Sequence, residues 1–329
     1  MLALMLVLIV PYWGQLTNAA GVLQRGQWAW LAAAVGAQLA WQVAQAAQFR
    51  AAFQLVGVPQ SLPALLPVVM ANNCINLIAP SGSASSFALF AADARRRRLP
   101  PARVVPGVML FAVLEYVALG VLSGCGVWLL HQRQALSWLH LLPALLMIGL
   151  ALALLGTLSL GSYSAVRLAR WMGWGAQGLN RAGLRLWRRE LFPAARVERF
   201  LGGLTESWAE LGRSGWRLRG LALGLALSAK AVWLAVLYLV AQAFQLELST
   251  GDLVIGVSVA ALFTVVSPTP QGIGIAEGAL ALTLAALGVP WDQAVVVGLA
   301  YRGLTLWLPV VSGFGWLHWW GRRWAGAAG

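Results

Sequence analysis

Four ionisable residues lie within long apolar segments of the chain: Glu115, Lys230, Glu277 and Arg302. Each would cost about 2.5–3.5 kcal/mol to place alone at the centre of a lipid bilayer, so pairing, hydration or a ligand must offset that cost. Two are acidic and two are basic, so they can form a neutral set that only holds a helical bundle together. Alternatively, Arg302 or Lys230 binds an anionic headgroup and a carboxylate releases it, and Arg suits phosphate because its planar fork donates two parallel hydrogen bonds.

The composition explains why these four residues are unusual. The chain has 329 residues, of which 60% are hydrophobic and 10% are charged, whereas soluble domains contain about 25% charged residues. This excludes an ordinary soluble enzyme and a disordered chain, and it indicates an integral membrane protein. The net charge of +13 comes from basic residues between apolar segments, which is typical of orientation in a membrane and argues against nucleic-acid binding.

Several apolar segments are long enough to cross a hydrocarbon core of about 30 Å. Tryptophan clusters at the ends of many of them, as in the aromatic belts of membrane proteins. Basic clusters, including the run Arg95–Arg98, are expected on the cytoplasmic side. We therefore predict a multi-pass protein of a bacterial inner membrane, with both termini in the cytoplasm. The predicted spans are residues 1–20, 28–49, 104–130, 138–160, 219–246 and 293–318.

Two further apolar regions, 62–92 and 253–288, are interrupted by Pro, Ser and Gly. Pro removes a backbone donor and clashes with the preceding turn, and Gly disfavours helix. Breaks at membrane depth are tolerated only where protein or water surrounds them. Each region therefore predicts a re-entrant hairpin or a discontinuous helix. The residues predicted to break the two hairpins are Pro80, Pro268 and Pro270.

The order of these segments suggests an inverted repeat within a single transmembrane domain, residues 1–329. The first repeat would be 28–130 and the second 219–320, each made of a span, a broken hairpin and a span. Inverted repeats whose broken helices meet near the midplane are typical of transporters. The alternative is that apolar segments resemble one another by composition. The overall prediction is an all-α polytopic bundle with two broken-helix hairpins.

Residues 162–218 form the only sizeable polar insertion. Apolar residues from Val197 to Leu211 follow the spacing of an amphipathic helix. We expect this helix to lie on the cytoplasmic leaflet, where its Arg residues favour anionic lipid. A helix packed under the bundle is the alternative.

No motif for catalysis, a metal or a cofactor is present in the sequence. Gly272-x-Gly274 is a weak match to a nucleotide loop, and His131, His140 and His318 lack the spacing of metal ligands. We therefore expect no enzymatic activity, no cofactor and no metal. Asn73 and Asn76, unusual in a lipid-facing helix, are expected to face a cavity or to cap a broken helix end.

The segment Ser267-Pro-Thr-Pro-Gln-Gly-Ile-Gly-Ile-Ala-Glu277, with Tyr301-Arg302 downstream, resembles the C-terminal signature of the flippase-like family. This is the lysylphosphatidylglycerol synthase transmembrane region, whose signature is Pro-x-Pro-Gly-Gly-x-Gly-x-x-Glu followed by Tyr-Arg. Asn76-x-x-x-Pro80-Ser81-Gly82 is similar to its N-terminal motif. Two departures from the family pattern stand out. Gln271 replaces the first Gly of the usual pair, and the acidic residue that often follows the Gly of the first motif is absent. The first hairpin is therefore expected to handle a different headgroup from that of the best-known members.

The resemblance implies a lipid translocase that works without the aminoacyltransferase domain of two-domain members, so synthesis of the lipid is not expected of this chain. We predict movement of a polar or anionic phospholipid between leaflets through a midplane cavity. Arg302 is expected to bind the phosphate and Glu277 to position or release Arg302, while Lys230 and Glu115 complete the polar lining. The predicted substrate-binding residues are Asn73, Asn76, Ser81, Gly82, Glu115, Lys230, Thr269, Gln271, Gly272, Gly274, Glu277, Tyr301 and Arg302.

Two alternatives remain open. One is a membrane-embedded enzyme acting on lipid-linked glycans, isoprenoids or aminoacyl lipids, with Glu115, Asp252 and Glu277 as its acids. The other is a scaffold that holds a lipid-synthesis enzyme through residues 162–218. The expected partners are membrane lipids with an anionic phosphate headgroup, together with such an enzyme or a second copy of the chain in a homo-oligomer, and not nucleic acid.

Overall fold

The computed structural model describes residues 26–78, 84–97, 99, 101–133, 209–267 and 269–315, together with isolated positions between 145 and 207. Within this part of the chain the secondary structure is helical, without strands. Among the described residues, three helices are long and apolar enough to cross a membrane: Val104–Gln132, Trp216–Ala243 and Trp291–Gly315. The prediction of an all-α polytopic membrane fold is confirmed.

Several sequence predictions fall outside the described residues. These are the first span at 1–20, most of the span at 138–160, most of the insertion at 162–218, and the site or break residues Pro80, Ser81, Gly82 and Pro268.

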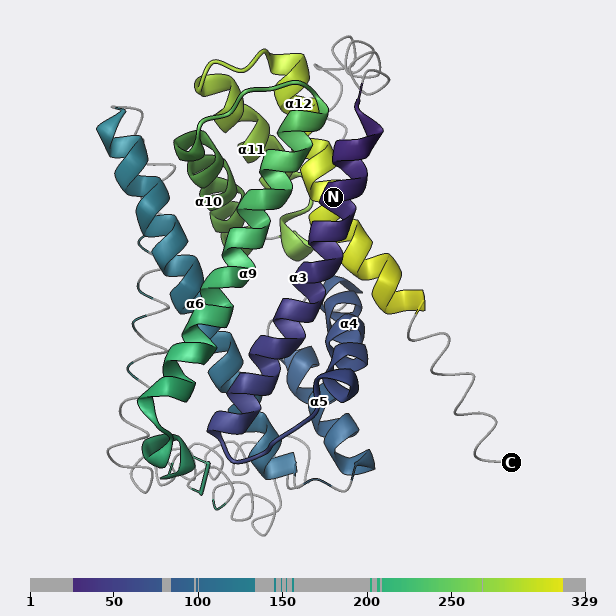
Figure 1. Cartoon of the computed structure of the whole chain (residues 1–329), viewed down its shortest axis with the longest axis vertical. Coiled ribbons are helices and arrows are strands. Elements are labelled where there is room, and N and C mark those ends of the chain that lie inside the picture. The colour runs from purple at the N-terminus through teal and green to yellow at the C-terminus, as the bar shows by residue number, and fades with distance from the viewer. Residues whose placement is uncertain are drawn as a thin grey trace, which may run out of the picture.

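Two long helices, α3 (Trp28–Leu55) and α9 (Trp216–Ala243), pack side by side and run in opposite directions through the middle of the molecule (Figure 1). α4 (Leu62–Ile78) and α5 (Ala84–Arg96) lie toward the end where α3 finishes and α9 begins. α10 (Thr250–Val266) and α11 (Ile275–Ala286) lie toward the other end. The two broken regions therefore approach the centre from opposite ends of the bundle.

The remaining helices complete each half. α6 (Pro101–Gln132) follows α5 and packs on α3, α5 and α10. A short 3₁₀ turn, η2 (Pro270–Gly272), joins α10 to α11. α12 (Trp291–Arg302) continues through a π-helical turn, η3 (Gly303–Trp307), into helix that is described as far as Gly315. π-turns occur often at functional sites, and this one begins directly after Arg302.

The order of helix lengths is the same in both halves. α3 and α9 have 28 residues each, α4 and α10 have 17 each, and α5 and α11 have 13 and 12. The predicted repeat stays a prediction. At about 1.5 Å per residue, a 17-residue helix is too short to cross a 30 Å core. A re-entrant course for the two hairpins is consistent with this length and stays a prediction.

The apolar core is divided between the halves. Around the first hairpin, Phe49 stacks on Phe111 with ring centroids 3.5 Å apart and contacts Phe90 and Phe53. Around the second, fully buried aliphatic residues of α9, α10 and α11, such as Leu237, pack together. Each hairpin is thus fixed to the long helices by its own core, which leaves polar residues between the two.

The N-terminus of α10 carries an electrostatic cap. Ser249 and Asp252 form a capping box, and Arg133 at the end of α6 pairs with Asp252. Burial raises the pKa of this carboxyl group, but hydrogen bonds from Ser249 and Arg133 outweigh it and hold the pKa below its usual value. The cap fixes the end of α6 to the start of the second hairpin.

Gly313 is required where the last helix crosses α4. A Cβ atom at this position would overlap the carbonyl oxygen of Met70 and touch Cys74. Gly313→Ala is therefore expected to destabilise the protein by about 1–3 kcal/mol, the usual effect of overpacking. Thermal unfolding in detergent measures the loss, and Gly124→Ala is the matched control because a Cβ there meets open space. Equal unfolding temperatures for the two variants would show that this crossing is not tight.

Candidate functional site

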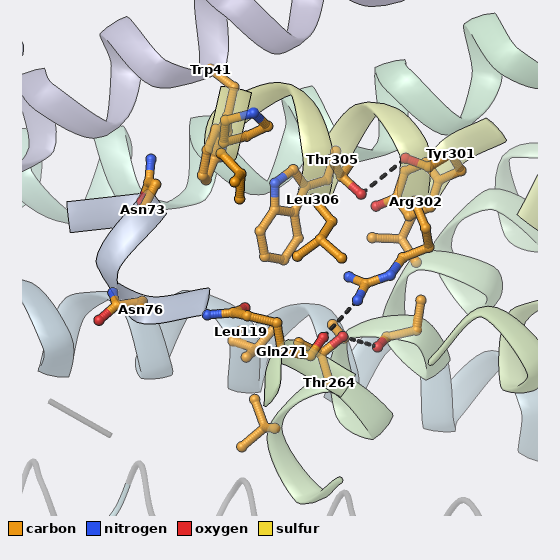
Figure 2. Close-up of a pocket in the computed structure, with 17 residues that line it drawn as sticks. Trp41, Asn73, Asn76, Leu119, Thr264, Gln271, Tyr301, Arg302, Thr305 and Leu306 are labelled. Carbon is orange, nitrogen blue, oxygen red and sulfur yellow. Dashed lines mark hydrogen bonds between the residues drawn. The ribbon is translucent and has the colours of Figure 1, made fainter. Parts of the chain in front are cut away.

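A cavity of about 140 Å³ lies where the two hairpins approach the long helices. Trp41 of α3 and Trp233 of α9 form an aromatic wall, with ring centroids 6.1 Å apart. The other lining residues come from α4, α6, α10, the η2 turn and the helix around η3 (Figure 2). The polar ones are Asn73, Asn76, Thr264, Gln271, Tyr301, Arg302 and Thr305.

Arg302, the last residue of α12, supplies the positive charge of this cavity. Its side chain extends toward the η2 turn, where Nη2 donates to the carbonyl oxygen of Gln271 at 2.6 Å (Figure 2). Its Nε donates to Oε1 of Glu277 at 3.2 Å. Among the described residues Nη1 has no hydrogen-bond partner, so the guanidinium is held in place and still has donors for a ligand.

Glu277 has a double role in holding Arg302. Its Oε2 accepts from the backbone N–H of Gly274 at 2.7 Å, which caps the N-terminus of α11, while its Oε1 accepts from Arg302. A carboxylate in the first turn of a helix is favoured by the helix dipole. Both oxygens are therefore occupied by groups that fix its position, and Glu277 does not line the cavity.

The η2 turn is shaped by residues that the sequence singled out. Gly272 has a φ of 72°, and a Cβ there would lie 2.7 Å from the Cα of Thr264. Thr269 donates to the carbonyl oxygen of Ile273 at 3.0 Å, and Gly274 also has a positive φ. These three residues build the turn and do not line the cavity.

Gln271 stands where the usual motif has a glycine, and its backbone conformation shows the consequence. It has a φ of 54°, a conformation that favours Gly. The glycine usual at this motif position suits that conformation without strain. In this chain the backbone at Gln271 keeps the positive φ, and the residue lines the cavity.

The first hairpin contributes Asn73 and Asn76 to the cavity wall. Asn73 donates to Oε1 of Gln45 at 2.9 Å. Asn76 accepts hydrogen bonds from Ser85 and Ser86 at 2.9 and 3.2 Å, so it joins the end of α4 to the start of α5 across the first break. Its amide nitrogen has no hydrogen-bond partner among the described residues.

Tyr301 is 3% exposed and lines the cavity beside Arg302. Its backbone carbonyl accepts from the Thr305 hydroxyl at 2.9 Å, within the π-helical turn. The Tyr301 side chain thus forms part of the wall from which Arg302 extends.

Lys230 and Glu115 form a second, separate ion pair between α9 and α6. The structure therefore brings the four buried charges together as two pairs, each of one base and one acid. Neither Lys230 nor Glu115 lines the cavity. The ammonium of Lys230 lies 3.9 Å from the ring centroid of Trp233, which does line it.

Sequence reasoning missed a column of glutamines on α3: Gln38, Gln42, Gln45 and Gln48. All are under 9% exposed, although glutamine is seldom buried. Gln45 bonds Asn73, Gln42 accepts from Ser312 at 3.1 Å, and Gln48 lies 3.4 Å from Glu115. The signal was their spacing of four, three and three residues, which places them on one face of a helix.

A family model described as "Lysylphosphatidylglycerol synthase TM region" matches residues 1–313. No curated protein matches the chain.

Proposed function

Because the chain belongs to the lysylphosphatidylglycerol synthase transmembrane-region family, we propose that it moves an anionic phospholipid between the leaflets of the membrane. It is a multi-pass membrane protein by its helices and its family. In the proposal the headgroup enters the cavity and the acyl chains stay in the bilayer.

The observation that carries this proposal is the free edge of the Arg302 guanidinium at the cavity. The side chain is held by Glu277 and by the Gln271 carbonyl, and Nη1 has no partner among the described residues. A planar, fixed guanidinium suits phosphate oxygens, and it need not be reordered when the ligand binds. Asn73 and Asn76 supply neutral polar contacts on the opposite hairpin.

The size of the cavity fits a headgroup and not a whole lipid. Its volume of about 140 Å³ is below the roughly 300 Å³ at which pockets begin to hold drug-sized molecules. Trp41 and Trp233 form an amphipathic wall at which a polar headgroup and the start of an acyl chain can both be accommodated.

The orientation belongs to the same proposal. The basic residues Arg95–Arg97 lie at the end of α5, and Arg217 and Arg219 lie at the start of α9. By the positive-inside rule, this end of the bundle is expected to face the cytoplasm. The membrane itself is proposed to be a bacterial inner membrane. The proposal needs no cofactor and no covalent chemistry on the lipid.

A vesicle assay tests the function directly. The purified full chain is reconstituted in phosphatidylcholine vesicles containing phosphatidylglycerol with a label on one acyl chain, and a membrane-impermeant quencher reports its movement. The proposal expects quenching of the inner-leaflet label well above the rate in protein-free vesicles, with the lipid recovered chemically unchanged. Movement no faster than in protein-free vesicles overturns it, and a chemically altered lipid points to the enzyme alternative.

A further inference from the structure

The Glu115–Lys230 pair lies one helical turn from the cavity on two separate helices. Glu115 precedes the cavity-lining Leu119 by four residues in α6, and Lys230 precedes the cavity-lining Trp233 by three in α9. Residues three or four apart in a helix share a face, about one 5.4 Å turn apart. In Figure 1 α6 and α9 both begin toward the lower end, where α5 lies, and in each helix the charged residue precedes the cavity-lining one.

The two buried cations differ in how freely each could bind an anion. Arg302 keeps Nη1 available while it is paired. The single ammonium of Lys230 is engaged by Glu115 and covered by the Trp233 ring, and its side chain is 4% exposed. Arg302 therefore presents a donor to the cavity while it is paired, whereas the Lys230 ammonium is held against Glu115 and outside the cavity lining.

The glutamine column provides a polar path to this pair. Gln45 contacts the cavity residue Asn73, and Gln48, one turn further along α3, contacts Glu115. Oε1 of Gln48, Nε2 of Gln42 and both amide atoms of Gln38 are buried without a hydrogen-bond partner in the described part of the chain. Buried amides of this kind are normally satisfied by water, so the face of α3 is expected to be hydrated.

We propose that Glu115 and Lys230 form a proton-operated charge switch that couples lipid movement to a proton gradient, with the glutamine column as the hydrated path for the proton. The inference rests on the proposed function, and it assigns the coupling ion, the site where that ion binds and a second cation for the headgroup.

The proposed step conserves atoms and charge. A hydronium ion in the column gives its proton to a carboxylate oxygen of Glu115, so an O–H bond forms there and a water molecule is left behind. Neutral Glu115 no longer holds the Lys230 ammonium, which then binds a phosphate oxygen of the anionic lipid. When the proton leaves to water on the other side, the carboxylate re-forms the pair and the phosphate is displaced.

Few other charged groups face this pair. Lys230 approaches from α9 and Gln48, which does not titrate, from α3. Tyr116, which is mostly buried, is the neighbour on α6 itself. Among the described residues, α5 and α10 place no charged side chain in contact with Glu115. A response to pH in this region is therefore expected to depend on Glu115.

The test uses the same vesicles with a proton gradient and an internal pH dye. The wild-type protein is expected to move labelled phosphatidylglycerol faster with the gradient than without it, and to carry protons as it does so. Glu115→Gln resembles the protonated acid, and its ratio of rates with and without the gradient is expected to fall to one. Asp252 lies outside the site, and the Asp252→Asn variant is expected to keep the wild-type ratio of rates with and without the gradient.

Two results overturn the switch and leave the proposed function intact. One is wild-type lipid movement that does not respond to the gradient, and the other is a Glu115→Gln variant that responds as the wild type does. If no lipid moves at all, equilibrium binding of phosphatidylglycerol by the protein in detergent still decides the question. Wild-type binding is expected to weaken about tenfold from acid to neutral pH, which corresponds to about 1.4 kcal/mol. Equal pH dependence in the wild type and in Glu115→Gln contradicts the switch.

Discussion

Arg302→Ala is expected to slow the movement of labelled phosphatidylglycerol by about thirtyfold or more. Hydrogen bonds to a charged group contribute about 1.5–3 kcal/mol, and about 2 kcal/mol corresponds to a factor near 30. The substitution also leaves the Glu277 carboxylate, 15% exposed, without its cation. Initial rates in reconstituted vesicles measure the effect.

Two variants separate binding from general damage. Arg302→Lys keeps the charge but loses the planar fork, which holds Glu277 and the Gln271 carbonyl at once, so it is expected to recover only part of the rate. Arg133→Ala breaks an arginine–aspartate pair away from the cavity and is expected to transport lipid at the wild-type rate. Wild-type rates in a folded Arg302→Ala protein would exclude Arg302 from headgroup binding.

Much of the fold could be predicted from the sequence because the membrane limits what an apolar segment can do. Only helices satisfy their own backbone hydrogen bonds in lipid, so length and composition identified the segments that became α6 and α9. The second break was predictable because Pro and Gly disfavour helix, and in the structure the η2 turn lies there. Pro67 and Pro106 lie inside α4 and α6, so a Pro alone does not mark a break. The π-helical turn after Arg302 gave no sequence signal, since it depends on how the last helix packs.

The site was harder to predict because pairing between helices depends on their relative position. The sequence placed Glu115, Lys230, Glu277 and Arg302 in apolar surroundings, and the hypothesis drawn from it connected Glu277 with Arg302 but gave Lys230 and Glu115 no definite partner. The structure resolves this as two pairs, and only Arg302 of the four lines the cavity. Thr269 and Gly274 were chosen for their motif, and in the structure they shape the turn beside the cavity.

The glutamine column was missed for a related reason. Glutamine carries no charge, so it does not stand out as the four ionisable residues do. Its importance follows from burial and from unmet hydrogen bonds at Gln38, Gln42 and Gln48. A search for amides at helical spacing within apolar spans would have found it, since buried polar groups require partners.

Lys230→Met is the second variant expected to have a large effect, in this case on stability. It leaves the Glu115 carboxylate, 23% exposed, without its cation inside the bundle. Removing one partner of a buried ion pair usually destabilises a protein by about 3–5 kcal/mol. Thermal unfolding of the purified protein in detergent is the measurement, and the loss is expected to be greatest at neutral pH.

The double variant Lys230→Met with Glu115→Gln decides whether the unpaired charge is the cause. Replacing both partners removes the uncompensated carboxylate, so most of the lost stability is expected to return, because apolar or neutral replacements of a buried pair are often nearly neutral. Lowering the pH should rescue the single variant in the same way, since protonation neutralises Glu115 without a mutation. The double variant should not respond to this change of pH. If the single variant is as stable as the wild type at neutral pH, the pair is well hydrated. If the double variant is no more stable than the single one, the loss comes from the packing of Lys230 against Trp233.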